Sequence, residues 1–405
     1  MTTFNYKARD EAGQSVKGLM DAESQEALAQ KLRRMGYMPT QISASRSSTI
    51  PLDDLGKWFE RIGVQDMIMF NLQLANMIES GLMILTSLRA IAGQLENRKL
   101  KDIVGQLERS IESGATFSDS LAQHPKVFPK LFISMVKTGE SSGQLAQVLT
   151  RYARYAEQQE DLRQKIRNAC FYPTILLAAG IVVIVFIVSF LVPRFVEIFE
   201  RSGIALPLPT QVIYSMGLGI KKFWYAVVLA LFGVTLLFKR FRGTEQGQWY
   251  FDRMVLKISL VGALVRKVII SRFCRTLATL VDSGVPILQG LDILKEVVGN
   301  KVFANVVQKT HDAVQEGDRI SQVLKVSQEF PSDVIQMIVV GEETGQLGKM
   351  LNKAADFYDT AVEYAVKKLT TLIEPVFLVI LGGLVGLIMA SVLLPIFDMV
   401  KTLRH

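Results

Sequence analysis

Apolar residues recur at helical spacing through two long segments of this chain, residues 65–173 and 271–374. In the first segment the pattern is broken at Gly81, Asn97, Gly114, Pro125, Pro129 and from Gly139 to Gly143. Such breaks leave about six helices of roughly 10–18 residues, joined by short turns as in a compact bundle. The pattern therefore predicts two all-α bundles.

Three apolar runs without a charged residue follow or separate these segments, at residues 175–192, 224–238 and 375–397. A helix needs about 20 apolar residues to cross a bilayer, so the first and third runs are long enough. The second run is short, and it reaches that length only with Phe223 or with residues 212–220, which lie beyond Lys221 and Lys222. We expect three transmembrane helices, with a buried core helix as the alternative for the second run.

The N-terminal segment has a different pattern. Apolar and polar residues alternate from Phe4 to Ala8 and again from Val16 to Met20, which predicts a hairpin. Ser24 can cap a following helix that ends at Gly36, and a short third strand can follow. We expect a small α+β domain here. A linker comes next, and then an amphipathic segment around Trp58 that either lies at the membrane surface or packs on the first bundle.

A heptapeptide occurs twice, as Gly-Glu-Ser-Ser-Gly-Gln-Leu at 139–145 and as Gly-Glu-Glu-Thr-Gly-Gln-Leu at 341–347. Upstream, identical residues pair at an offset of 203, among them Phe70/Phe273, Leu74/Leu277, Ser80/Ser283, Gly81/Gly284, Leu88/Leu291, Gly114/Gly317 and Leu121/Leu324. The offset then becomes 202, as in Phe128-Pro129 and Phe330-Pro331. A proline precedes each long apolar run and a second lies twenty residues later, giving the pairs Pro173/Pro193 and Pro375/Pro395. The unit of bundle and span is therefore a tandem duplication.

The duplication predicts the topology. Two copies of a bundle followed by a span face the same side only if an extra span returns the chain between them, and the run 224–238 supplies it. The distribution of lysine and arginine near the spans agrees with this topology, because more of them lie on the bundle side than on the other side. The bundle side has ten: Arg163, Lys165, Arg167, Lys239, Arg240, Arg242, Arg253, Lys257, Lys367 and Lys368. The other side has six: Arg194, Arg201, Lys221, Lys222, Lys401 and Arg404. We expect cytoplasmic bundles and N-terminus, and a periplasmic C-terminus.

The expected fold is an all-α integral membrane protein with two duplicated cytoplasmic helical bundles, three transmembrane helices and a small α+β N-terminal domain. In chain order its parts are the N-terminal domain 1–48, a linker or amphipathic helix 49–64, the first bundle 65–173, a first span 174–193, a periplasmic loop 194–222, a second span 223–239, a cytoplasmic connector 240–270, the second bundle 271–374, a third span 375–397 and a periplasmic tail 398–405.

Composition changes this interpretation little. Hydrophobic residues make up 49% of the 405 residues and the mean hydropathy is +0.27, which the apolar runs explain. A net charge of +8 could indicate a nucleic-acid partner, but retained cytoplasmic lysine and arginine explain it better, so we expect none. Two cysteines, Cys170 and Cys274, predict no disulfide framework.

The sequence shows no recognisable motif for catalysis or for binding a cofactor. Three histidines lie far apart, so we expect no metal site. Gly348-Lys349 resembles part of a phosphate loop, but Glu343 and Met350 stand where that motif needs glycine and Ser/Thr. We expect no catalytic residue and no cofactor. Gly382 and Gly386 lie one turn apart in the third run and predict close helix packing there.

The duplicated turns are the candidate site. Their glycines Gly139, Gly143, Gly341 and Gly345 permit a tight turn, and Ser141 or Ser142 can cap the next helix. The acids Glu140, Glu342 and Glu343 have two interpretations. They are either solvated first-turn acids that favour the helix dipole or contacts for a basic partner or a cation such as calcium.

These features together resemble the GspF/PilC family, the inner-membrane platform proteins of type II secretion systems and type IV pili. The most specific stretches are residues 272–288, both Gly-Glu-x-x-Gly-Gln-Leu copies and residues 165–173, which lead to Pro193. Met83 stands where the second copy has Pro286, and Glu374 stands where the first has Tyr172. The signature residues nearest the membrane are Lys165, Tyr172, Pro173, Pro193, Glu374, Pro375 and Pro395.

The resemblance implies a non-enzymatic platform in the bacterial inner membrane. Its implied partners are a hexameric assembly ATPase of the GspE/PilB type, prepilins or pseudopilins, other inner-membrane assembly proteins, membrane lipid and further copies of the chain. A transporter or channel component and a membrane-anchored signalling scaffold are the alternatives. We expect both duplicated turns to face the ATPase or another copy. Changing Glu140 and Glu342 together to lysine should then abolish filament assembly without loss of protein.

Overall fold

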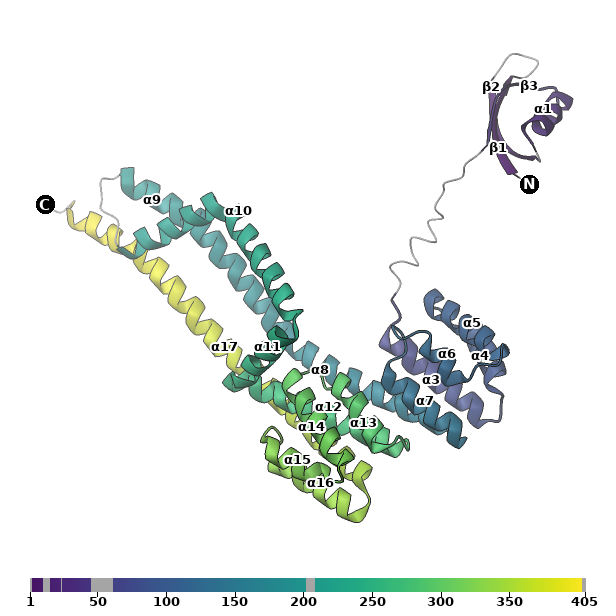
Figure 1. The fold of residues 1–405 in the computed structure, drawn as a ribbon. Coiled ribbons are helices and arrows are strands. Elements are labelled where there is room, and N and C mark those ends of the chain that lie inside the picture. The colour runs from purple at the N-terminus through teal and green to yellow at the C-terminus, as the bar shows by residue number, and fades with distance from the viewer. Residues whose placement is uncertain (1, 10–14, 23, 45–60, 202–207, 403–405) are drawn as a thin grey trace. The chain divides into compact units, whose positions relative to one another are not determined.

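The structure is a computed structural model of the chain and describes residues 2–9, 15–22, 24–44, 61–201 and 208–402 (Figure 1). Contacts divide the chain into an N-terminal unit, residues 1–61 with 97–99, and a second unit formed by residues 62–96 and 100–405. Most of the amphipathic segment 49–64 with Trp58, part of the loop 194–222 and the end of the C-terminal tail lie outside the described residues.

Within residues 2–44, the described part of the N-terminal unit forms three strands and one helix. Strands β1 (Thr2–Arg9), β2 (Ser15–Ala22) and β3 (Met38–Ala44) form an antiparallel sheet in the order β2-β1-β3. Helix α1 (Gln25–Arg34) begins where the Ser24 hydroxyl accepts a hydrogen bond from the backbone N–H of Ala27, at 3.2 Å. Leu28 and Leu32 of α1 pack against Phe4 of β1, so the core is the helix face laid on one side of the sheet.

The second unit begins with six helices that follow the breaks in the apolar pattern. They are α3 (Val64–Glu79), α4 (Ile84–Gln94), α5 (Arg98–Glu112), α6 (Phe117–Ala122), α7 (Lys130–Ser142) and α8 (Leu145–Phe186). Aromatic rings join α3, α7 and α8 through Phe128, which lies in the turn before α7. The Phe128 ring centroid is 6.4 Å from that of Phe70 on α3 and 5.7 Å from that of Phe132 on α7, and the Phe132 centroid is 4.4 Å from that of Tyr152 on α8. With six residues, α6 is shorter than the expected 10–18 residues. With 42 residues, α8 continues past the expected end of the bundle at residue 173.

The same order returns in the second half of the chain. Its helices are α12 (Ser259–Asp282), α13 (Ile287–Val297), α14 (Lys301–Gln315), α15 (Ile320–Ser327), α16 (Ser332–Thr344) and α17 (Leu347–Thr402). Phe330 joins this core in the way Phe128 joins the first, with Phe273 at 4.7 Å and Phe303 at 5.3 Å. Met83 and Pro286 each stand directly before the equivalent helices α4 and α13, so the substitution between copies leaves that boundary unchanged.

After α8, a π-helical turn η1 (Ile187–Leu191) completes the first copy of the apolar run, and α9 (Val192–Arg201) follows it. Among the described residues, α10 (Leu208–Arg242) and α11 (Glu245–Lys257) lie between the repeats and have no counterpart. The short second run and the apolar stretch 212–220 belong to the same helix, α10, which has a non-helical residue at Phe223. Among the described residues one helical segment, Leu145–Arg194, is long and apolar enough to cross a membrane, and 17% of its most apolar window is buried.

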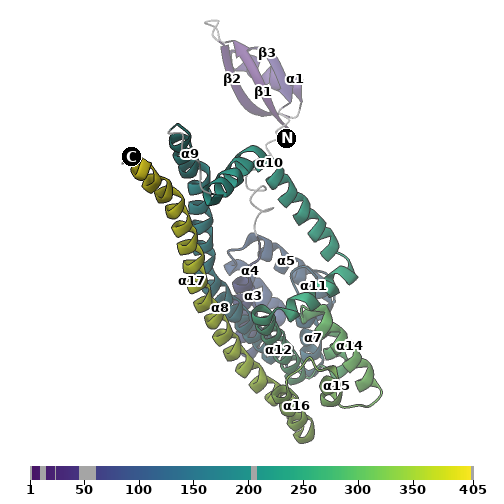
Figure 2. The ribbon, with the colours of Figure 1, turned by 90° about the vertical axis from the view of Figure 1, so that its left-hand side faces the viewer.

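The long helices α8 and α17 lie side by side where they leave their bundles (Figure 2). Leu162 of α8 shares a small apolar cluster with Val362 and Val366 of α17. Next to this cluster, Nζ of Lys165 lies 2.6 Å from Oε1 of Glu363. The two repeats are thus joined at equivalent points on their long helices.

Candidate functional site

The carboxylate of Glu140 is used inside the first bundle. Glu140 lies in the last turn of α7 and accepts hydrogen bonds from the start of α6: from the backbone N–H of Phe117 at 2.7 Å, the N–H of Ser118 at 3.2 Å and the Ser118 hydroxyl at 2.7 Å. The first N–H groups of a helix lack partners within that helix, and the helix dipole favours a negative charge there. Glu140 therefore fixes the start of α6 against the end of α7.

Glu342 does the same in the second bundle. It lies in the last turn of α16 and accepts hydrogen bonds from the Ser321 hydroxyl and from the Ser321 backbone N–H, the latter at 3.4 Å. Ser118 and Ser321 are equivalent at the offset of 203. The duplication therefore repeats a complete interaction and not only a sequence motif.

The glycines of the heptapeptide shape the same corner. Gly139 is buried, and a Cβ atom there would lie 2.8 Å from Cγ2 of Val148 on α8. At Gly341 a Cβ atom would lie 2.9 Å from Cα of Leu347. Gly143 and Gly345 end α7 and α16 with positive φ of 70° and 67°, a conformation that glycine adopts without strain. The motif thus forms the tight turn between the last short helix of each bundle and its long helix, and we call this turn the corner.

The expected roles of the serines and acids in these turns need correction. Ser141 and Ser142 do not cap α8, because Gly143 ends α7 only after them; Gln144 precedes α8 and makes no side-chain cap. The Ser141 hydroxyl donates to the backbone carbonyl of Lys137 at 2.9 Å. Glu140 and Glu342 are last-turn residues that bind another helix, and not solvated first-turn acids. Lysine at both positions would therefore also remove two internal helix contacts.

The surface that each turn leaves to solvent is small and polar. In the first copy Ser141, Ser142 and Gln144 are exposed, and in the second copy Glu343 and Gln346 are exposed. The Glu343 side chain is 58% exposed, and Arg319 lies 3.7 Å from its carboxylate. A partner that reaches these corners would therefore meet amide, hydroxyl and carboxylate groups at the outer edge of the motif.

The predicted membrane-proximal residues are spread along the long helices. Lys165 is paired with Glu363, and the hydrogen bond between them raises the pKa of Lys165. Tyr172, Glu374 and Pro375 are exposed, Pro173 is buried within α8, and Pro193 is half-buried in α9. Pro395 lies in α17, where its side chain is outside the described part of the structure.

Close packing of α8 and α17 occurs at Gly180, which the sequence analysis missed. A Cβ atom there would lie 2.5 Å from the Phe377 ring, so α17 touches the backbone of α8 at this point. Around Gly382 and Gly386 no atom of the described residues lies within 4 Å of an added Cβ atom. The spacing of Gly382 and Gly386 drew attention to α17, whereas a single glycine in α8 carries no such signal.

A buried charge network in the second bundle was also missed. Arg275 is 4% exposed and donates hydrogen bonds of 2.6 Å to both Asp356 and Asp359 of α17. The Ser271 hydroxyl also donates to Asp359. Burial alone would lower the pKa of Arg275, but the hydrogen bonds to Asp359 and Asp356 outweigh it, and the pKa is raised. This network ties α12 to α17. At the repeat offsets the first bundle has Leu72 and Glu157 instead of Arg275 and Asp359.

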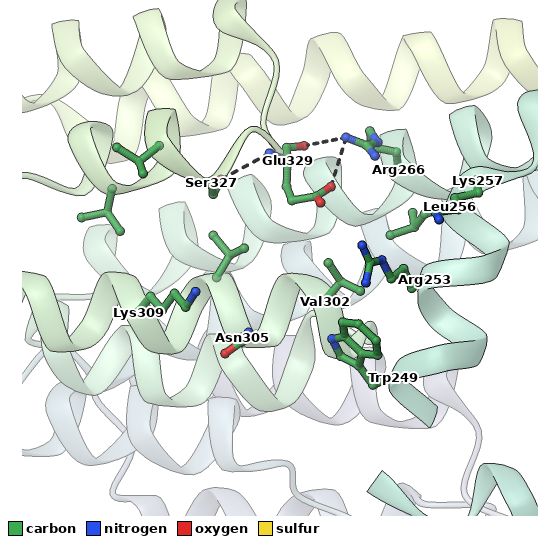
Figure 3. Close-up of a pocket in the computed structure, with 13 residues that line it drawn as sticks. Trp249, Arg253, Leu256, Lys257, Arg266, Val302, Asn305, Lys309, Ser327 and Glu329 are labelled. Atoms are coloured by element: carbon green, nitrogen blue, oxygen red, sulfur yellow. Dashed lines mark hydrogen bonds and ion pairs between the residues drawn. The ribbon is translucent and has the colours of Figure 1, made fainter. Parts of the chain in front are cut away.

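The best-formed pocket lies between α11, α12, α14 and α15 and has a volume of about 550 Å³. Figure 3 shows Arg253 of α11 and Lys309 of α14 on opposite sides of it. Arg253 lies over the Trp249 ring, 4.9 Å from its centroid, and Arg266 pairs with Glu329 at 3.1 Å. The lining also holds Lys257 and Asn305, so the pocket suits an anionic group. Within the described residues no group of His, Cys, Asp and Glu could hold a metal ion.

The segments that match a known protein family coincide with the two repeats seen in the structure. The family model of the type II secretion system protein F matches residues 70–193 and 273–395, which are the two copies of the bundle with its long helix. The model of the protein F N-terminal domain matches residues 1–43. The chain belongs to the type II secretion system protein F family. Together the matches leave out mainly the linker and the elements α9 to α11.

Full-length relatives have the same extent as this chain. The type IV pilus assembly protein PilC of Thermus thermophilus is 36% identical over 100% of this chain and 99% of that protein. PilC of Myxococcus xanthus is 34% identical over 99% of this chain and 96% of its own length. The type II secretion system protein F of Vibrio cholerae is 31% identical over 98% of both. Pilus and secretion members thus both align from end to end.

Proposed function

We propose that this protein is an inner-membrane platform of a type IV pilus or type II secretion machine, which couples a cytoplasmic assembly ATPase to the insertion of prepilins or pseudopilins into a growing filament. Family membership supports the setting, since relatives that align over their full length are named for pilus assembly and for type II secretion. The bundles contain structural ion pairs and capping carboxylates, which suit a mechanical part.

The observation that carries the proposal is the continuity of α8 and α17. Each long helix starts at a Gly-Glu-x-x-Gly-Gln-Leu corner in its bundle and continues without a break into an apolar run (Figure 1). At 1.5 Å per residue, the 42 residues of α8 span about 63 Å and the 56 residues of α17 about 84 Å. A displacement of either corner would therefore move the apolar end of the same rigid helix.

The proposed topology places residues 174–193, 223–239 and 375–397 in the membrane. The bundles 65–173 and 271–374 then lie in the cytoplasm, and residues 194–222 and 398–405 in the periplasm. The unmatched helix α10 supports this arrangement, since it lies between the repeats and supplies the odd crossing that like-facing copies require. Its kink at Phe223 falls beside Lys222, where the apolar run meets its first charge.

The proposed ATPase contact uses the outer edge of the two corners. The carboxylates of Glu140 and Glu342 are occupied by Ser118 and Ser321, so Glu343, Gln144 and Gln346 remain for a partner. A photo-crosslinking amino acid in place of Glu343 or Gln144 is expected to capture the assembly ATPase in living cells. The same amino acid in place of exposed Lys101 on α5 is the matched control. Capture of the ATPase from Lys101 alone, or from none of the three, would refute the contact.

A further inference from the structure

Besides the contact between α8 and α17, the two repeats touch through different faces. In this second contact the first repeat uses α8, where the Arg151 guanidinium donates to the backbone carbonyl of Asp282 and the Tyr155 hydroxyl lies 3.1 Å from Oγ1 of Thr276. The second repeat uses α12, α13 and the turn between them, whose Leu280, Val285 and Ile293 are buried in the core of the first bundle. This second contact is head-to-tail, because one copy offers its long helix and the other offers its first two helices.

Each repeat also has a surface equivalent to the one that the other repeat uses in this contact, and within one chain that surface stays free. At the offset of 202, Arg151 and Tyr155 correspond to Lys353 and Phe357 on α17. At the offset of 203, the receiving residues Thr276, Asp282 and Val285 correspond to Gln73, Glu79 and Leu82 on α3 and after it. We name these two surfaces the α17 face (Val340, Lys353, Phe357) and the α3 face (Met69, Gln73, Glu79, Leu82, Met83).

Both unused faces expose apolar side chains. On the α17 face Phe357 is 55% exposed and Val340 is 43% exposed. On the α3 face Met83 is 80% exposed, Met69 is 55% exposed and Leu82 is 45% exposed. Clustered apolar groups on the surface of a helical bundle indicate an interaction surface more often than isolated ones do. Phe357 and Leu82 occupy positions whose equivalents, Tyr155 and Val285, are buried where the same contact is made within the chain.

The polar and apolar groups of the two faces fit the same arrangement. Arg151 donates to the backbone carbonyl of Asp282 within the chain, and the corresponding residues are Lys353 and Glu79, both exposed. Lys353 would thus reach the backbone beside Glu79, and its charge is opposite to that of the Glu79 side chain. Phe357 and Leu82 stand in place of Tyr155 and Val285.

We propose that the α17 face of one copy binds the α3 face of a second copy of this chain, repeating between chains the contact that joins the repeats within a chain. Such a heterologous interface leaves one free face at each end and is satisfied fully only when the copies close into a ring. In that ring the first and second repeats alternate. Every bundle then makes the same kind of contact on both sides.

Crosslinking of introduced cysteines in membranes tests the pairing in the full-length protein. Two differently tagged copies in a Cys170→Ser background are co-expressed, one with Gln73→Cys and the other with Phe357→Cys. Cys274 can remain, because it is completely buried and its burial raises the pKa of the thiol. These positions correspond to Thr276 and Tyr155, whose hydroxyl groups lie 3.1 Å apart. Because the tyrosine hydroxyl lies far beyond its Cβ atom, two cysteines there are too distant for a disulfide, and a short bis-maleimide is expected to join the mixed pair.

Expression of each variant alone distinguishes head-to-tail binding from a two-fold interface. Head-to-tail binding predicts crosslinks in the mixture and none when either variant is expressed alone. Crosslinks of either variant with itself would mean a two-fold interface and would overturn the proposal. Yields no higher than those of a Lys101→Cys and Phe357→Cys mixture would overturn it as well.

Charge reversal gives a second test, which is measured by the same crosslinking yield. Glu79→Lys or Lys353→Glu alone is expected to lower the mixed crosslinking yield about fivefold, as for the loss of one exposed ion pair. Both changes together in every copy should restore the yield, since the pair then forms with its signs exchanged. Failure of the double variant to recover, with unchanged protein levels, would contradict the pairing of Lys353 with Glu79.

Discussion

Replacing Arg275 with methionine is expected to destabilise the second bundle by about 3–5 kcal/mol, the cost of leaving a buried ion pair without one partner. The side chain of Arg275 is 5% exposed and that of Asp359 is 24% exposed, so little water can replace the hydrogen bond to Asp359, whereas Asp356 is 67% exposed and water can solvate it. Methionine fills a similar volume, and the loss therefore reports on charge more than on a cavity. Denaturant or thermal unfolding of the full-length protein in detergent measures the effect.

Arg89 provides the matched control for this variant. It also binds two carboxylates, those of Glu108 and Glu112, but its side chain is 56% exposed. Arg89→Met is expected to cost less than about 1 kcal/mol, because exposed ion pairs contribute little. Adding Asp359→Asn to Arg275→Met should recover part of the stability, since the uncompensated charge is removed. Equal losses for Arg275→Met and Arg89→Met would contradict the buried network.

Replacing Glu140 with alanine is expected to cost about 2–4 kcal/mol, because three hydrogen bonds to a charged acceptor are lost and two backbone N–H groups at the start of α6 lose their partner. The loss is local, so amide hydrogen exchange in residues 117–122 should accelerate more than exchange in α3 or α5. Mass spectrometry of peptides from the detergent-solubilised protein measures it.

The neighbouring acid of the second copy separates this capping role from a general effect of charge. Glu343→Ala removes a carboxylate that is 58% exposed and 3.7 Å from Arg319, and we expect a change within about 0.5 kcal/mol. Glu342→Ala should resemble Glu140→Ala, with faster exchange at Ser321. If Glu140→Ala left the exchange of Phe117 and Ser118 unchanged, the corner would not be held by its carboxylate.

Local signals in the sequence predicted much of the bundle architecture. Gly81, Gly114 and Gly143 all end or separate helices with positive φ, and Ser24 caps α1 as its position indicated. The repeat offset also located the second bundle without knowledge of the structure, because each break of the first copy has an equivalent. These features depend on one residue and its immediate neighbours, and such signals are legible in a single sequence.

Interactions between residues that lie far apart in the sequence could not be predicted from such local signals. Glu140 binds a residue 22 positions earlier, and Arg275 reaches Asp359 84 positions later. Neither partner has a distinctive local pattern, since serine and aspartate are common on helices. The helix α8 also continues through Pro173, where the sequence suggested a boundary between bundle and span. That proline is buried, and neighbouring helical residues on both sides keep the turn helical.

A platform role requires both bundles to lie on the same side of the membrane. Ser113 and Glu316 are equivalent at the offset of 203 and exposed at the ends of α5 and α14. In a Cys170→Ser background, Ser113→Cys and Glu316→Cys should both be shielded from a membrane-impermeant maleimide in intact cells and labelled after lysis, whereas Arg194→Cys should be labelled in intact cells. Labelling of one bundle cysteine but not the other before lysis would place the repeats in opposite compartments and contradict the platform.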